Sequence, residues 1–191
     1  MKIYIARHGL TDWNKEMRAQ GRKDLPLNAE GRAQAEELRN TIKDIEFTAV
    51  YASPLKRAAE TAQIAVGDRY DIIYDDRLLE RSFGDFEGKV VKSWSELVDG
   101  VNIDDIALEE IPGGVEPVCS MLARVNSFLD YLKENYDDNA TILVVGHGAM
   151  SKAFDWALTE HSADDVFGKT HLGNAEAKKY EAKGRFSTIR K

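Results

Sequence analysis

The sequence predicts an α/β domain with a mostly parallel sheet that is covered by helices on both faces. Short apolar runs rich in β-branched and aromatic residues alternate with longer stretches whose apolar residues recur at helical spacing. Strands that alternate with helices form parallel sheets, because each helix returns the chain to the starting edge of the sheet. Three of the predicted strands end in charged or reactive side chains. Ligands of such sheets bind beyond the carboxyl ends of the strands.

Length and composition restrict the class of protein. The 191 residues, 43% of them apolar, suit one domain with a real core. A net charge of −7 argues against a nucleic-acid partner. The single cysteine, Cys119, excludes an internal disulfide framework and indicates a reducing compartment. No apolar run is long enough to cross a membrane, so we expect a cytoplasmic protein with no membrane partner.

The first part of the chain contains three predicted strands and two predicted helices. The strands are residues 3–6, 47–52 and 70–74. Asn28 is a typical cap for the first helix, whose apolar residues recur at helical spacing as far as Ile45. We expect Ser53 to cap the second helix, with Pro54 in its first position and an end near Val66.

A long irregular stretch, about 75–114, separates these elements from the rest, and a short helix is expected near Trp94. The clearest helix of the chain starts at Pro117, where apolar residues repeat at helical spacing as far as Leu132. A fourth strand, 140–145, and a helix, 149–158, follow. The tail predicts a weak hairpin, formed by residues 175–181 and 186–189.

Three strand exits carry the reactive side chains: Arg7-His8-Gly9, Ser53-Pro54-Leu55-Lys56-Arg57 and Gly146-His147-Gly148. If these strands are parallel neighbours, their exits meet at one pocket. The glycine of the first exit lets the backbone turn or lets a ligand approach closely. Two arginines, two histidines and the helix N-termini nearby make a strong anion site, to which Asn14 adds a side-chain amide.

The histidines are suited to phosphoryl transfer. A neutral imidazole is a competent nucleophile toward phosphorus, and we expect His8 to be neutral. The positive charges of Arg7 and Arg57, and of a charged His147, lower the pKa of its ring. The cationic surroundings can replace the metal ion found at many phosphoryl-transfer sites.

Several motifs occur in an order that spans nearly the whole chain: Arg7-His8-Gly9 with Thr11 and Asn14, Gln20-Gly21, Pro26-Leu27, Ser53-Pro54-Leu55-Lys56-Arg57-Ala58 with Glu60-Thr61-Ala62, Leu79-Glu80 with Phe83-Gly84 and Glu87-Gly88, and Gly146-His147-Gly148. Together they resemble the histidine phosphatase superfamily, branch 1, the phosphoglycerate mutase-like group. The resemblance implies a three-layer αβα sandwich with a mostly parallel central sheet. Residues 1–191 then form one domain, in which about 75–114 is a partial lid insertion.

The resemblance also implies a reaction and its residues. His8 is the nucleophile that becomes phosphorylated, and Glu80 gives a proton to the leaving oxygen. The phosphate pocket consists of Arg7, Asn14, Arg57 and His147, and further substrate contacts come from Gln20 and Gly21. The expected activity is hydrolysis of small phosphomonoesters, with no metal and no cofactor. The oligomeric state, monomer or homodimer, stays open.

Three other functions remain possible at this point. The nearest is a 2,3-bisphosphoglycerate-dependent phosphoglycerate mutase, but Ser82-Phe83 replaces the His-Tyr of the mutases and the lid lacks their paired arginines. A metallohydrolase would use His8, His147 and Glu80 as ligands, although two arginines beside a dication argue against it. A non-catalytic phosphate-binding module is disfavoured because the nucleophile and the carboxylate are both present.

Residues outside the motifs receive simpler interpretations. His161 and His171 are expected to be exposed or satisfied histidines, Cys119 a packing thiol and Asn174 a turn residue. Tryptophans 13, 94 and 156 are expected in the core or at its rim. The role of Glu116 stays open, because the family often has Glu-Ser where this chain has Val115-Glu116.

The predicted lid is strongly acidic. Residues 84–116 contain nine Asp or Glu residues and only two lysines, Lys89 and Lys92. We interpret these acids as a solvated face. The alternative is that they disfavour polyanionic substrates, and the scarcity of lid cations favours hydrolysis over mutase chemistry.

Overall fold

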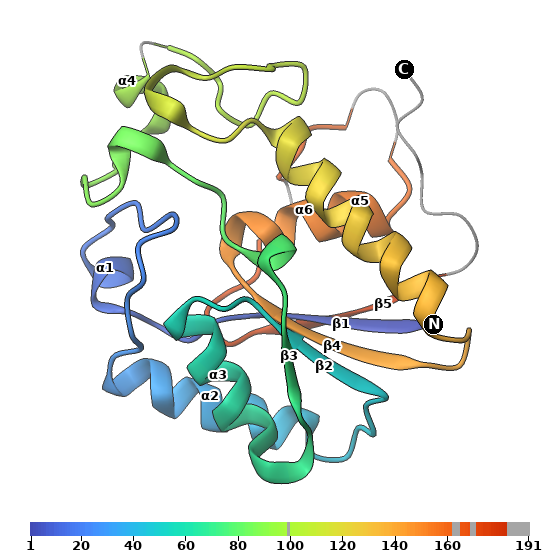
Figure 1. Cartoon of the computed structure of the whole chain (residues 1–191). Helices are drawn as coiled ribbons and strands as arrows, with labels where there is room; N and C mark the ends of the chain where they lie inside the picture. The colour runs from blue at the N-terminus through green and yellow to red at the C-terminus, as the bar shows by residue number, and fades with distance from the viewer. Residues whose placement is uncertain (99, 162–164, 169–170, 183–191) are drawn as a thin grey trace.

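A computed structural model describes residues 1–98, 100–161, 165–168 and 171–182 (Figure 1). Its centre is a five-stranded sheet with the strand order β3-β2-β4-β1-β5. The strands are β1 (Lys2–Arg7), β2 (Ala49–Ala52), β3 (Ile72–Tyr74), β4 (Thr141–Gly146) and β5 (Ala177–Glu181). The predicted α/β class is confirmed.

The sheet is parallel except at one edge. β1 and β2 both pair with β4 in parallel, and β3 pairs with β2 in parallel. β5 runs antiparallel to β1, with Ile3 opposite Tyr180. The first arm of the predicted tail hairpin is a strand, but it pairs with β1 in the main sheet. The second predicted arm, 186–189, lies outside the described residues.

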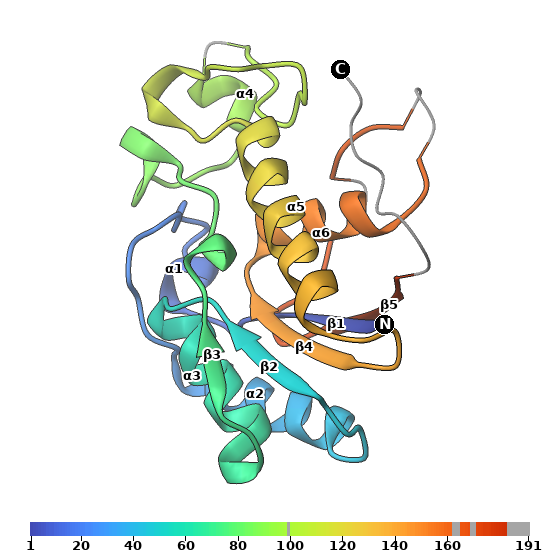
Figure 2. The same cartoon turned by 45° about the vertical axis from the view of Figure 1, so that its right-hand side comes forward.

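Helices cover both faces of the sheet and make three layers (Figure 2). One face packs on α2 (Ala29–Ile42) and α3 (Lys56–Val66), the other on α5 (Val118–Asn135) and α6 (Gly148–Leu158). Two short helices, α1 (Asp12–Lys15) and α4 (Trp94–Leu97), lie outside these layers. Among the helices of the described ranges, none combines the length and the hydropathy needed to span a bilayer.

Alternation along the central strands explains the two cores. In β4, Ile142 and Val144 face α5 and α6, while Leu143 and Val145 face α2 and α3. All four side chains are buried, as expected for a parallel sheet with two covered faces. The helices present apolar stripes to these faces, and α5 buries a residue on almost every turn between Val118 and Leu132.

The N-terminus of α2 is fixed by the predicted cap and by a glycine pair. The Asn28 side chain accepts a hydrogen bond from the Gly31 backbone N–H at 2.9 Å. A Cβ on Gly9 would lie 2.3 Å from the Gly31 carbonyl oxygen, and a Cβ on Gly31 would lie 2.1 Å from that of Leu10. Gly9 therefore permits a close approach of α2 to the loop after β1, a role different from the backbone turn or the ligand approach that we expected of it.

The predicted start of α3 is wrong by two residues. Leu55 is the N-cap, with an extended backbone, and the helix begins at Lys56. Ser53 and Pro54 lie before it, so Ser53 does not cap the helix. Its hydroxyl instead lies 2.7 Å from a ring nitrogen of His147.

The segment 75–114, here called the lid, has a small apolar core of its own. Short 3₁₀ helices and α4 surround a cluster formed by Phe86, Val98, Ile103, Ile111 and Val115. Arg81 holds this segment together from inside. It is fully buried, and its guanidinium bonds the carbonyl oxygens of Ile103 and Glu116 and a carboxylate oxygen of Asp104. The lid lies beyond the carboxyl ends of the parallel strands (Figure 1).

Candidate active site

The three motif-bearing strand exits meet at one edge of the sheet. His8 N–H donates to the Gly146 carbonyl at 2.9 Å, and Ser53 N–H donates to the Val145 carbonyl at 3.0 Å. A cleft of about 370 Å³ lies at this edge, between the sheet and the lid. The predicted site residues that line it are Arg7, His8, Asn14, Gln20, Gly21, Arg57 and Glu80.

His8 is buried and oriented by its own neighbour. Its Nδ1 lies 2.6 Å from the Gly9 carbonyl oxygen, which can only accept a hydrogen bond, so Nδ1 carries the proton. Burial, followed by the charges of Arg57 and Arg7, lowers the pKa of His8 well below 6.5. The ring is therefore neutral at pH 7, and its lone pair is on Nε2.

His147 faces His8 across the exits of β1 and β4. The ring centroids are 5.3 Å apart. Burial lowers the pKa of His147 well below 6.5, and the charges of Arg57, His8 and Arg7 add to this effect. Our expectation of a charged His147 is therefore wrong, because the ring is fully buried and lies near the positive charges of Arg57 and Arg7. Burial, rather than a charged His147, is the largest cause of the neutral state of His8.

Both arginines are fixed by backbone carbonyl oxygens. The Nη1 and Nη2 atoms of Arg57 donate to Lys23 and Gly21, each at 2.7 Å. Burial lowers the pKa of Arg57 to about 10, so the side chain is still charged at pH 7. Arg7 Nη1 donates to the Leu172 carbonyl at 2.8 Å. A Cβ on Gly148 would lie 3.3 Å from the Arg7 guanidinium carbon, so a glycine makes room for it.

Three buried polar atoms around His8 have no hydrogen-bond partner among the described residues: Arg7 Nε, Arg57 Nε and His147 Nδ1. Buried donors are rarely left unpaired, because each costs about 1–3 kcal/mol. Here the unpaired atoms belong to the side chains that surround the imidazole. Arg7 Nε and Arg57 Nε carry protons and positive charge, so an anion is the type of partner that suits them.

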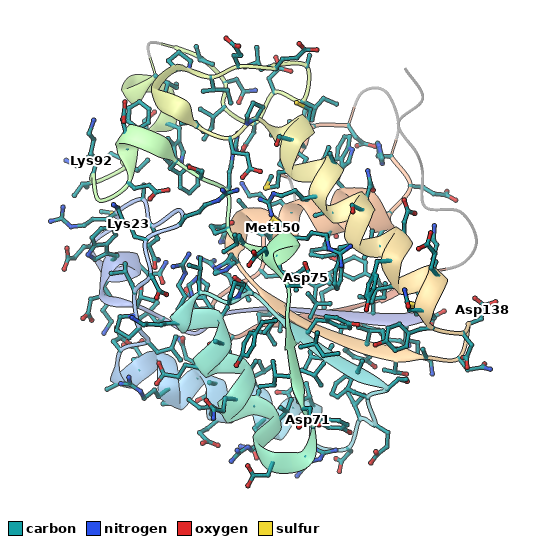
Figure 3. The ribbon with its side chains drawn as sticks, in the orientation of Figure 1. Lys23, Asp71, Asp75, Lys92, Asp138 and Met150 are labelled. Atoms are coloured by element: carbon teal, nitrogen blue, oxygen red, sulfur yellow. The ribbon has the colours of Figure 1, made fainter. Side chains whose placement is uncertain are left out.

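Glu80 is held at the N-terminus of α6. Its carboxylate accepts hydrogen bonds from the backbone N–H groups of Arg81 at 2.9 Å and of Ala149 and Met150 at 3.3 Å. Figure 3 labels Met150, which lies between the sheet and the segment leading to the lid. Glu80 is buried and lines the cleft, and its charge partly offsets the effect of burial on the pKa values of Arg7 and Arg57.

The loop after β1 supplies amide groups to the cleft. Asn14 Oδ1 accepts a hydrogen bond from the Thr11 N–H at 3.1 Å, which uses the acceptor side of the amide and leaves its NH₂ group for a ligand. Gln20 is buried, with its Oε1 lying 3.0 Å from Thr11 Oγ1. Gly21 uses its carbonyl oxygen to hold Arg57.

The sequence did not identify two groups of the cleft. His171 is an exposed histidine with a hydrogen-bond partner, as expected, but it also lines the cleft, with its Nε2 2.9 Å from Arg7 Nη1. The second group is Arg81, Asp104 and Lys152, in which Asp104 pairs with both cations at 2.8 and 3.4 Å. No local motif marks either group, because each depends on contacts between distant segments.

The acidic residues of the lid mostly face solvent. Asp85, Asp105, Glu109 and Glu110 are exposed and do not line the cleft, as the solvated-face interpretation predicts. Asp104 does line it, but Arg81 and Lys152 neutralise its charge. Glu116 is buried and accepts hydrogen bonds from Arg124 and Arg22, so it joins the lid base to α5 and to the loop after α1.

The donor set does not favour a metal ion. Within the described ranges, no three His, Cys, Asp or Glu side chains are placed so that they could hold one. His8, His147 and Glu80 therefore do not form the three-ligand set of a metallohydrolase.

Comparison with known proteins agrees with this geometry. A family model described as the histidine phosphatase superfamily (branch 1) matches residues 3–191. The chain is 35% identical over 178 residues to the uncharacterized phosphatase PhoE of Bacillus subtilis, a match that covers 91% of this chain and 84% of PhoE. It is 33% identical over 161 residues to phosphoglycerate mutase-like protein 4 of Arabidopsis thaliana, a match that covers 80% of this chain and 68% of that protein.

A solved structure shares the fold. Mycobacterial glucosyl-3-phosphoglycerate phosphatase, determined in complex with VO3, superposes with a TM-score of 0.82 at 25% identity, over 93% of this chain and 91% of that one. The family model, the motifs and the fold coincide over nearly the full length. This chain belongs to the histidine phosphatase superfamily, branch 1.

Proposed function

We propose that the protein is a phosphatase that hydrolyses small phosphomonoesters through a phosphohistidine intermediate on His8, without a metal ion. The observation that carries the proposal is the set of three unpaired buried atoms, Arg7 Nε, Arg57 Nε and His147 Nδ1, around a neutral imidazole. Arg7 Nε and Arg57 Nε always carry a proton, and such charged N–H groups near a nucleophile are suited to the oxygens of a phosphoryl group. The phosphatases among the similar proteins support the same class of reaction.

The reaction has two steps. His8 Nε2 attacks phosphorus, the P–O bond to the leaving group breaks, and the protonated Glu80 gives its proton to the departing oxygen. Glu80 then takes a proton from water, and the resulting hydroxide attacks phosphorus. The P–N bond breaks, inorganic phosphate leaves and the lone pair returns to His8.

Glu80 is placed to exchange that proton. Three backbone N–H groups hold its carboxyl group in place. A dianionic phosphate ester bound in the cleft repels a negative charge on Glu80 and favours the protonated form. Binding of the substrate therefore supplies the acid that the first step needs.

The remaining residues position the substrate. We assign Asn14 and Gln20 to contacts with phosphoryl oxygens or the leaving group, because both line the cleft, and Gly21 to the support of Arg57. Residues 75–114 form a lid over this single-domain site. The lone cysteine supports a cytoplasmic location.

A phosphoglycerate mutase is the second candidate, and similarity to a mutase-like protein favours it. Such an enzyme must hold a second anionic group at the cleft mouth while excluding water. The lid contributes Lys92, labelled in Figure 3, to the cleft, and Arg18 and Lys152 line it from outside the lid. Arg18 is paired with Glu16 and Lys152 with Asp104, so the mouth has few unneutralised cations.

The test is a panel of phosphomonoesters assayed with and without a chelator. We expect hydrolysis that the chelator does not change and that His8→Gln abolishes. His161→Gln is the matched control, because His161 lies outside the cleft, and it should keep the activity. Loss of activity with chelator, restored by a divalent metal, would contradict the proposal.

A parallel assay separates the two candidate functions. The protein is incubated with 3-phosphoglycerate and catalytic 2,3-bisphosphoglycerate, and 2-phosphoglycerate is measured against free phosphate. Isomerisation much faster than the hydrolysis of every monoester tested would establish the mutase instead.

A further inference from the structure

Ser53 has a role that its place in the sequence does not reveal. It directly follows β2, and Ala52 of β2 lies opposite Val145 of β4. β4 ends at Gly146, so continuing the parallel register places Ser53 opposite Gly146, one residue before His147. Ser53 and His147 are fully buried, and Ser53 Oγ lies 2.7 Å from His147 Nε2.

The protons of this contact can be assigned by counting donors and acceptors. The Leu55 backbone N–H donates to Ser53 Oγ at 3.4 Å, which uses one lone pair of the hydroxyl. The hydroxyl proton then needs an acceptor, and the neutral ring of His147 offers Nε2. The opposite assignment, with Nε2–H donating to Oγ, would leave the buried hydroxyl proton without an acceptor at that contact, at a cost of about 1–3 kcal/mol.

We propose that Ser53 is a positioning residue that fixes His147 in the tautomer with its proton on Nδ1. This inference rests on the proposed function for its catalytic consequence, but not for the tautomer itself. Nδ1 is buried and has no hydrogen-bond partner among the described residues, and the His147 ring lies with its centroid 5.3 Å from that of His8. With the proton there, His147 presents a neutral N–H donor to a phosphoryl oxygen.

The tautomer decides whether His147 attracts or repels the phosphoryl group. If the proton were on Nε2, the Nδ1 lone pair would face the oxygens and oppose their negative charge. During phosphoryl transfer negative charge is spread over these oxygens, so a fixed N–H donor directed at them stabilises the transition state. Ser53 acts on this step only through His147.

The direct test is the tautomer state of His147 in the ligand-free protein. The chain has only four histidines, so long-range ¹H–¹⁵N correlation of ¹⁵N-histidine-labelled protein resolves each ring, and His147→Gln assigns the signal. We expect the Nδ1–H tautomer in the wild type and in Ser53→Thr, which keeps a hydroxyl. In Ser53→Ala we expect a shift toward Nε2–H. A wild-type His147 with its proton on Nε2 would overturn the proposal, whether or not any variant folds.

Kinetics give the second measurement. Ser53→Ala should lower kcat/KM by about 10- to 100-fold, the loss expected when the partner that orients a functional histidine is removed, and should weaken vanadate inhibition by a similar factor. Ser53→Thr should recover most of both. Ser151→Ala is the matched control: Ser151 is a buried serine of α6 whose hydroxyl bonds the Gly148 carbonyl at 2.7 Å, and its loss should leave the His147 tautomer unchanged.

The two proposals can fail separately. A protein that hydrolyses no phosphomonoester but changes the His147 tautomer in Ser53→Ala would contradict the proposed function and support the role of Ser53. An active protein whose tautomer and kcat/KM are the same in Ser53→Ala as in the wild type would contradict the role of Ser53 alone.

Discussion

The charged and aromatic side chains of the site are each bound to the protein on one side and open to a ligand on the other. Arg57 gives two N–H groups to backbone carbonyl oxygens and keeps Nε unpaired, and His8 gives Nδ1–H to Gly9 and keeps its Nε2 lone pair. Donors fixed in this way need no rearrangement when charge develops on a phosphoryl group. At the scale of single residues, the site is preorganised for an anion before any ligand enters.

Replacing the carboxyl group of Glu80 tests its role as the acid. Glu80→Gln keeps one oxygen, which can still accept hydrogen bonds from the Arg81 and Met150 N–H groups, but its amide cannot act as the acid. We expect the rate of alkyl phosphate hydrolysis to fall by about 10²–10⁴. The loss should be much smaller with nitrophenyl phosphate, whose leaving group needs little protonation.

Glu87 provides a matched control for this substitution. Its carboxylate also accepts hydrogen bonds from backbone N–H groups, those of Arg22 and Phe83, but it does not line the cleft. Glu87→Gln should therefore leave the ratio of the two rates unchanged. An equal loss with both substrates in Glu80→Gln would show that Glu80 acts through charge or geometry and not through proton donation.

At the scale of elements, the sequence predicted those helices, strands and caps that depend on residues close to one another in the chain. The apolar runs of the central strands, the stripe of α5 and the Asn28 cap each depend on residues close in sequence, and each is confirmed. Ser53 was misinterpreted because Ser-Pro is a common helix start, whereas its hydroxyl is used by His147, 94 residues away in the chain. Arg81 and His171 lacked any local pattern because their partners lie on other segments.

The motif residues could be placed together from the sequence because parallel strands share one carboxyl edge. Arg7, His8, Arg57 and His147 are brought to this edge by β1, β2 and β4, as predicted. The neutral state of His147 could not be predicted, since it depends on complete burial, which the sequence does not report. The positions of these four side chains could be inferred from the order of the strands. The protonation state of His147 could be read only from the folded structure.

The contact between α2 and the loop after β1 gives a prediction at this scale. A Cβ on Gly31 would lie 2.1 Å from the Leu10 carbonyl oxygen, so Gly31→Ala must displace backbone beside His8. We expect a loss of about 1–3 kcal/mol in the free energy of unfolding, together with lower kcat/KM, measured by denaturant titration and steady-state kinetics.

Gly146→Ala is the control, since nothing lies within 4 Å of the Cβ position at Gly146. It should change the free energy of unfolding much less than Gly31→Ala does. Equal destabilisation by the two substitutions would show that the close packing of α2 on the loop is not the cause.

At the scale of the whole molecule, the two buried histidines link stability to pH. Their pKa values are well below 6.5 in the folded state, mainly because of burial. Below pH 6.5 the unfolded chain therefore binds protons that the folded protein does not, and this favours unfolding. The free energy of unfolding should fall as the pH decreases from 6.5, by up to about 1.4 kcal/mol per pH unit for each histidine.

Two variants separate this effect from that of the carboxylates. His147→Gln should make the free energy of unfolding depend less steeply on pH between pH 6.5 and 5, measured by urea unfolding at a series of pH values.

Burial alone would raise the pKa of Asp75, but its hydrogen bonds and ion pair with Arg77 lower it below 3.8. Asp75 therefore contributes a stabilisation that is lost only at lower pH. Asp75→Asn should reduce stability by a constant amount between pH 6.5 and 5, and an unchanged slope in His147→Gln would contradict the account.

The covalent intermediate on His8 is the measurement that tests the central claim most directly. The protein is mixed with a ³²P-labelled phosphomonoester, quenched within milliseconds and analysed for protein-bound label. We expect label that is labile in acid and stable in base, that maps to the peptide containing His8, and that is absent from His8→Gln. An active enzyme that never carries label, or label that persists in His8→Gln, would contradict the phosphohistidine mechanism.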